Sequence, residues 1–146
     1  MTERMSMRKM SPAGFQVLAA LERHVASTVQ PPVRELIRLR ASILNGCAYC
    51  VDLHSREALR AGEDSRRLFA VAAWRESPFF DDRERAALAL TDAVTRLDQS
   101  AVPDEVWNDA VRHWSEEEVA NLILAIGTIN LWNRIAVSTR TQPPAR

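Results

Sequence analysis

Residues 35–54 read ELIRLRASILNGCAYCVDLH and contain the chain's two cysteines, Cys47 and Cys50, separated by two residues. In thioredoxin-like proteins such a CxxC pair belongs to a βαβ unit and follows a strand. Here the residues before the pair repeat apolar side chains at helical spacing. Asn45-Gly46 then suits a helix end, because both residues tolerate left-handed backbone. The pair therefore lies between two expected helices, which argues against a thioredoxin fold and predicts an all-α protein.

Apolar residues at helical spacing continue on both sides of this stretch, and no strand-like alternation is sustained. Prolines, glycines and capping residues divide the chain into helical segments. We expect helices that contain residues 15–25, then run from Pro31 to Asn45, Cys47 to Gly62, Asp64 or Ser65 to Ser77, Asp81 to Leu97, Pro103 to Val111 and Ser115 to about Ala136. The prediction is one all-α domain, residues 1–146, of about six or seven helices. Its core would span about residues 15–137, with a loose tail over 138–146.

The overall composition is that of a globular protein: 146 residues, 47% hydrophobic and 26% charged, with 19 basic and 19 acidic side chains. A core of this size needs no disulfide or metal for folding. The zero net charge disfavours nucleic acid and anionic membranes, which attract a basic excess. No apolar run approaches the roughly 18 residues of a membrane span, and the N-terminal residues lack the apolar segment of a signal peptide. We expect a soluble, cytoplasmic protein.

The last expected helix is apolar around most of its circumference between Ala120 and Ala136. A helix of this kind is buried, either at the centre of the fold or against a partner subunit. We expect this helix to lie at the centre of the fold and also against a partner subunit, and hence we expect a homo-oligomer. Trp132 lies on this helix, where it either anchors the core or an interface, or lines the mouth of a site.

Three side chains with reactive chemistry follow one another on the third expected helix. Cys47, Cys50 and His54 have the spacing i, i+3 and i+7, which places them on one face. A helix N-terminus favours a thiolate, and a histidine one turn after Cys50 can take its proton. This pattern suits a dithiol that attacks an electrophile and closes to a disulfide. Two alternatives stay open: the three residues could bind zinc, although a structural site needs a fourth ligand, or the cysteines could be small core residues.

The segment also resembles a known family. Glu35 stands twelve positions before Cys47 and completes the pattern Glu-x11-Cys-x2-Cys-x3-His. This pattern, with AAWRESPFFDDRERAAL at 72–88 and INLWNR at 129–134, resembles the alkylhydroperoxidase D family of the carboxymuconolactone decarboxylase superfamily. The resemblance implies an all-helical trimer or hexamer and a thiol peroxidase that reduces hydroperoxides. Its electrons would return from a lipoyl-type or other dithiol donor, and no metal or other cofactor is implied.

The resemblance also implies a role for each matched residue. Cys50 would attack the peroxide, Cys47 would resolve it to a disulfide, and Glu35 with His54 would form a proton relay. The helix end alone would favour the thiolate on Cys47 instead. Tyr49 stands where some family members carry a relay histidine, and a phenol is a poor base at neutral pH. The CxxC pair argues against the decarboxylase reaction. The rival functions are a redox sensor that uses the same disulfide as a switch, and a zinc-binding helical module.

Overall fold

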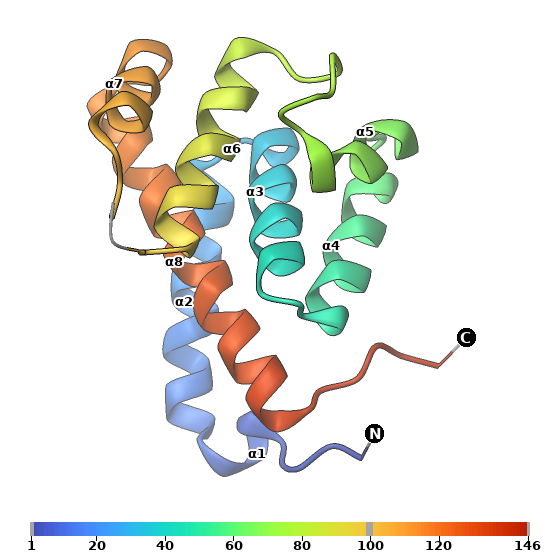
Figure 1. Cartoon of the computed structure of the whole chain (residues 1–146). Helices are drawn as coiled ribbons and strands as arrows, with labels where there is room; N and C mark the ends of the chain where they lie inside the picture. Colours follow the sequence, from blue (N-terminus) through green and yellow to red (C-terminus); the bar gives the residue numbers. More distant parts are fainter. Residues whose placement is uncertain (1, 99–100, 146) are drawn as a thin grey trace.

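A computed structural model describes residues 2–98 and 101–145, and within them every regular element is helical (Figure 1). The elements are α1 (Met7–Met10), α2 (Pro12–Thr28), α3 (Pro31–Leu44), α4 (Ala48–Arg60), α5 (Ser65–Ala70), the 3₁₀ turn η1 (Val71–Ala73), α6 (Asp82–Thr95), α7 (Asp104–His113) and α8 (Glu116–Thr139). The all-α prediction is confirmed. The structure adds α1, which the sequence pattern did not indicate, and divides the expected helix 64–77 into α5 and η1.

The turn that carries the cysteines is fixed by the end of α3. Gly46 has φ +65°, its amide donates to the Ile43 carbonyl at 3.1 Å, and the Cys47 amide donates to the Ser42 carbonyl at 3.0 Å. These two bonds form a Schellman motif, which satisfies the last carbonyls of the helix and reverses the chain. Cys47 then caps the N-terminus of α4 with extended backbone. The Asn45-Gly46 helix end predicted from the sequence therefore places both cysteines beside α3.

Helix α3 lies at the centre of the fold and packs against α4, α6 and α8 (Figure 1). All residues from Glu35 to Ser42 are buried, although several of them are charged. One face of α3 carries Ile37 into an apolar cluster with α6 and α8, and another carries Leu36 into a cluster with α4, α5 and α6. The arginines of α3 gave no indication in the sequence that this helix is central. The sequence analysis instead expected the apolar α8 to be the central helix.

Helix α8 packs along α2, α3 and α6, and it begins with the capping box of Ser115 and Glu118 that the sequence predicts. By length and composition alone it could cross a membrane, contrary to the sequence estimate, and half of its most apolar window is buried inside the fold. Its outer face exposes three large apolar residues, Leu124, Leu131 and Val137. Helix α8 therefore packs into the fold with one face and leaves large apolar side chains of its other face exposed.

The C-terminal segment departs from the predicted loose tail at 138. Helix α8 continues to Thr139, and the left-handed Arg140 (φ +58°) lets the Thr141 amide donate to the Ala136 carbonyl at 2.9 Å. The N-terminal segment joins it there, because the Arg4 amide donates to the Thr139 carbonyl at 2.8 Å. Figure 1 shows both ends of the chain at the same end of the molecule, on the side of the turn that precedes α4. This arrangement brings the first residues of the chain to the cysteines.

Candidate active site

The two cysteines lie at the start of α4 with free thiols. Cys47 is 2% exposed and Cys50 is 3% exposed. The Cys50 thiol hydrogen-bonds to Cys47, and this bond lowers the pKa of Cys47 to about 6 even though burial of the sulfur opposes the shift. The amide of Cys50 and the side chain of Asn133 add to the effect. The same Cys47 contact, together with burial, raises the pKa of Cys50. In the reduced protein the negative charge therefore rests on Cys47, and Cys50 holds the proton.

His54 lies one turn after Cys50 and contacts the predicted carboxylate directly. Its Nδ1 is 3.2 Å from Glu35 Oε2, with no need for a bridging water. Both side chains are buried. Glu35 reaches His54 because α3 and α4 run side by side, so residues 19 positions apart face each other.

A second carboxylate, which the sequence analysis did not select, contacts the same nitrogen. Glu57 Oε2 lies 3.1 Å from His54 Nδ1 and comes from the next turn of α4. Burial of the ring lowers the pKa of His54, but the contacts with Glu35 and Glu57 outweigh it and raise the pKa above its ordinary value. The two carboxylates thereby favour the protonated imidazole, which is the form that can donate a proton. The i, i+3 spacing of His54 and Glu57 was the sequence signal that could have identified the pair.

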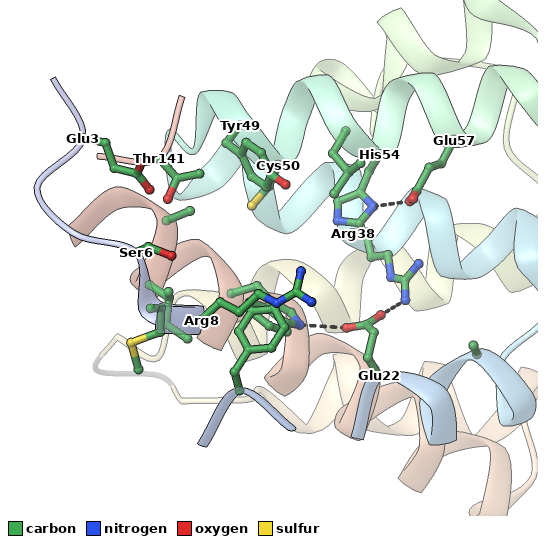
Figure 2. A pocket seen from close by; sticks show the side chains of 17 residues that line it. Glu3, Ser6, Arg8, Glu22, Arg38, Tyr49, Cys50, His54, Glu57 and Thr141 are labelled. Atoms are coloured by element: carbon green, nitrogen blue, oxygen red, sulfur yellow. Dashed lines mark hydrogen bonds and ion pairs between the residues drawn. The ribbon is translucent and has the colours of Figure 1, made fainter. Parts of the chain in front are cut away.

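Arg38 links this relay to α2 and α8. Its guanidinium donates to Glu35 Oε1 at 2.8 Å and also pairs with Glu22, whose other carboxylate oxygen accepts from Trp132 Nε1 at 2.8 Å. Figure 2 draws the contacts of Glu22 with Arg38 and of Glu57 with His54 as dashed lines. The chain of contacts fixes Glu35 from the side opposite His54.

A group of neutral polar side chains lies behind the cysteines. Asn133 is fully buried, donates to Ser42 Oγ at 3.0 Å and accepts from Asn45 Nδ2 at 2.9 Å. Hydrogen bonds from Asn133 favour the charged form of both sulfurs, and Ser42 does the same for Cys50. None of these three residues was selected from the sequence as a site residue. Their sequence positions show no pattern, because α8 and the end of α3 meet only in the fold.

A pocket of about 530 Å³ opens over this site. Cys50, His54 and Glu57 line it (Figure 2), whereas Cys47 and Glu35 are not among its lining residues. The rest of its lining combines apolar residues of α1, α2, α4 and α8 with a few polar ones, among them Met7, Phe15, Leu53, Trp132, Ile135, Arg8, Glu22, Arg38 and Tyr49. Cys50 is therefore the sulfur that a ligand in the pocket meets first. Trp132 lies at the site, as one of the two readings of its sequence position allowed.

Glu35, His54 and Glu57 also bring three ligand atoms within 4.8 Å of one another, a spacing that a metal ion could occupy. In the part of the chain that the structure describes, Cys47 and Cys50 do not join His54 in such a group. Arg38 and Arg34 already occupy Glu35 Oε1, at 2.8 and 3.2 Å. Two guanidinium groups at one ligand would repel a divalent cation. The geometry fits a proton relay better than a metal site.

Comparison with known proteins decides the family. Residues 12–93, which include α3 and the whole relay, match the carboxymuconolactone decarboxylase family. The chain belongs to this family. The uncharacterized protein YdfG of Bacillus subtilis is 36% identical over 139 residues, which cover 94% of this chain and 95% of that protein.

Solved structures also share the fold of this chain. ATU0492 of Agrobacterium tumefaciens, a protein of unknown function whose name compares it with the antioxidant defence protein AhpD, is 41% identical. The two superpose with a TM-score of 0.96 over 99% of this chain and 100% of that one. The debrominase Bmp8 is 23% identical and gives a TM-score of 0.83 over 94% of this chain and 74% of its own. The predicted alkylhydroperoxidase D-like fold is confirmed.

Proposed function

We propose that this member of the carboxymuconolactone decarboxylase family is a thiol peroxidase that reduces hydroperoxides through a Cys47–Cys50 disulfide. The observation that supports it most is the shared pocket. Cys50 and His54 face the same cavity, and the low-pKa Cys47 lies hydrogen-bonded behind Cys50. One sulfur is placed to meet a substrate, the other to meet the first sulfur, and an acid is placed to supply protons.

The reaction begins with a proton shift between the sulfurs. The Cys50 thiol passes its proton to Cys47 along their hydrogen bond, which leaves a thiolate on the sulfur that lines the pocket. This thiolate attacks the terminal oxygen of the hydroperoxide, the O–O bond breaks, and a sulfenic acid forms on Cys50. The alkoxide that leaves takes a proton from His54 and departs as an alcohol. Sulfur is oxidised by two electrons and the peroxide is reduced by two.

The second step closes the disulfide. Neutral His54 accepts the Cys47 proton, and the Cys47 thiolate attacks the Cys50 sulfur. The S–S bond forms, the S–O bond breaks, and the hydroxide takes the proton back from His54 to leave as water. Solvent then reprotonates His54 through Glu57, whose side chain is 41% exposed. Across both steps two thiols and one hydroperoxide yield one disulfide, one alcohol and one water.

Access and charge favour different sulfurs for the first attack. The negative charge of the resting pair lies on Cys47, but Cys50 is the one that lines the pocket. We assign the attack to Cys50 because it lines the pocket and Cys47 does not. A low pKa for Cys47 also suits its second role, since Cys47 must lose the proton that it received before it attacks the sulfenic acid.

The return of electrons and the assembly belong to the same proposal. A dithiol, of the lipoyl type or another, would reduce the disulfide in a reducing cytoplasm. The exposed Leu124, Leu131 and Val137 of α8 would pack against further copies in a trimer or hexamer. The proposed reaction involves neither nucleic acid nor a membrane.

The test is stopped-flow oxidation of the reduced, metal-free protein by hydrogen peroxide and cumene hydroperoxide, beside Cys50→Ser and Cys47→Ser, with mass spectrometry of the products. We expect loss of two thiols per chain in the native protein. Sulfenic acid should be trapped on Cys50 only in Cys47→Ser. Sulfenic acid on Cys47 in Cys50→Ser, formed at the native rate, would reverse the two roles. Oxidation no faster than that of a small free thiol would refute the peroxidase and favour the redox switch.

A further inference from the structure

The pocket is much larger than hydrogen peroxide requires. Its 530 Å³ is roughly 18 times the share of one molecule in liquid water, about 30 Å³. Hydrogen peroxide has two heavy atoms and would leave most of this space to water. Pockets of about 300–1,000 Å³ are the usual size for organic ligands that are largely enclosed. The volume therefore indicates an organic substrate with an extended body.

The walls beside Cys50 are apolar and aromatic. Phe15 of α2 and Trp132 of α8 meet edge to face, with ring centroids 5.5 Å apart. Leu53 and Ile135 extend the same surface along α4 and α8. Apolar side chains of this kind gain free energy by removing a hydrocarbon from water. The body of the substrate is expected to be hydrocarbon.

One cation of the pocket is left for a ligand. The Arg38 guanidinium is committed to Glu35 and Glu22. Arg8 lies on α1 with its guanidinium carbon 5.9 Å from the centre of the Phe15 ring, and it forms no ion pair within residues 2–98 and 101–145. Figure 2 shows the Arg8 guanidinium extending into the pocket, on the side opposite Cys50. A planar fork of N–H donors in this position suits a carboxylate.

The segment that carries Arg8 is held in place. The Arg4 amide donates to the Thr139 carbonyl at 2.8 Å, and the Arg4 guanidinium donates to the Ser138 carbonyl at 3.1 Å. Both bonds attach the first residues of the chain to the end of α8. Arg8 is thereby kept over the same pocket wall that Trp132 forms.

We infer that the pocket selects hydroperoxides of long-chain carboxylic acids, with the hydrocarbon against Phe15 and Trp132, the peroxide at Cys50 and the carboxylate at Arg8. This inference rests on the proposed function for its chemistry, but not for its binding step. A flexible chain allows the carboxylate to reach Arg8 while the peroxide reaches the sulfur.

The test compares the hydroperoxide of linoleic acid with that of its methyl ester, which lacks the negative charge and carries one more methyl group. The rate constant for oxidation of the reduced protein is measured for each in the native chain, Arg8→Gln and Lys9→Gln. Lys9 is exposed on the same helix and does not line the pocket, so it is the matched control. One charge-assisted contact at a partly open site is worth about fivefold, and we expect the acid to react faster than the ester by this factor. Arg8→Gln should remove the preference and Lys9→Gln should keep it.

Equal rates for acid and ester in the native chain, or a preference that survives in Arg8→Gln, would overturn the inference. A separate measurement keeps it apart from the peroxidase proposal. Binding of unoxidised linoleate and of its methyl ester to Cys50→Ser is followed by tryptophan fluorescence, since Trp132 lines the pocket. Tighter binding of the acid that is lost on Arg8→Gln supports the carboxylate site even if no hydroperoxide reacts. Equal binding of both refutes it even if the peroxidase is active.

Discussion

Asn133→Leu should weaken both the fold and the thiolate. Asn133 is fully buried, and leucine is close to it in volume, so the substitution mainly removes hydrogen bonds. Ser42 keeps a partner, because its hydroxyl donates to the Arg38 carbonyl at 2.7 Å. The amide of Asn45 keeps one bond, to Asn130 Oδ1 at 2.9 Å, and loses the other. One donor without a partner costs about 1–3 kcal/mol, and since Asn45 is half-buried we expect about 1–2 kcal/mol. For a chain of this length the melting temperature should fall by about 2–8 °C.

The same substitution should raise the pKa of Cys47 from its value of about 6, because a hydrogen bond from Asn133 favours the thiolate. The assay is the rate of alkylation by iodoacetamide as a function of pH, on the reduced protein, with urea unfolding in parallel. The midpoint of the alkylation profile should move to higher pH. Asn108→Leu, at an exposed position of α7, is the control for which neither quantity should change. A destabilised protein whose alkylation midpoint stays near pH 6 would show that Asn133 supports the fold alone.

Three further outcomes follow, one from the relay and two from α8. Glu57→Gln should lower the pKa of His54. As the pH rises, the proton donor is then lost earlier, so the peroxidase rate should begin to fall at a lower pH than in the native protein. Glu76→Gln, at an exposed position, is the control, and its pH profile should match the native one. Ile126→Ala should cost about 2–5 kcal/mol in urea unfolding because Ile126 is fully buried. Leu124 is 42% exposed, so Leu124→Ala should change the free energy of unfolding of a single protomer little. A clear loss of particle mass in light scattering would place Leu124 in a subunit interface. An unchanged particle mass would exclude it from one.

The helices were predictable where local chemistry decides them. The capping boxes of Asp81 with Glu84 and of Ser115 with Glu118 form as the sequence indicates. The break after Ala70 was not predictable, because its cause is distant in sequence. Arg40 of α3 donates to the carbonyls of Val71 and Ala72, at 3.3 and 2.8 Å. Carbonyls that accept from a side chain do not require the next turn of an α-helix.

The site residues, too, include some that the sequence could predict and some that it could not. The residues of α3 and α4, Glu35, Cys50 and His54, were predictable because their spacing matches a family pattern and both helices adjoin the turn. Glu57 follows His54 on the same face and was within reach of helical periodicity. Arg8 could not be found by these means, since the segment that carries it is attached through Arg4 to the end of α8, which is distant in sequence.

Cys47 and Cys50 have different roles, and their order at the start of α4 determines which role each one has. Cys47 stands at the N-cap of α4, where the Cys50 thiol and then the Cys50 amide donate hydrogen bonds to its sulfur and lower its pKa. One turn later the chain faces the pocket, so Cys50 meets the substrate. A single low-pKa sulfur open to the pocket would react with any oxidant and could proceed to irreversible sulfinic acid. With the charge stored on Cys47, Cys50 becomes nucleophilic only when their shared proton moves to Cys47. The sulfenic acid of Cys50 then forms beside a low-pKa thiol, which closes the disulfide once it loses that proton.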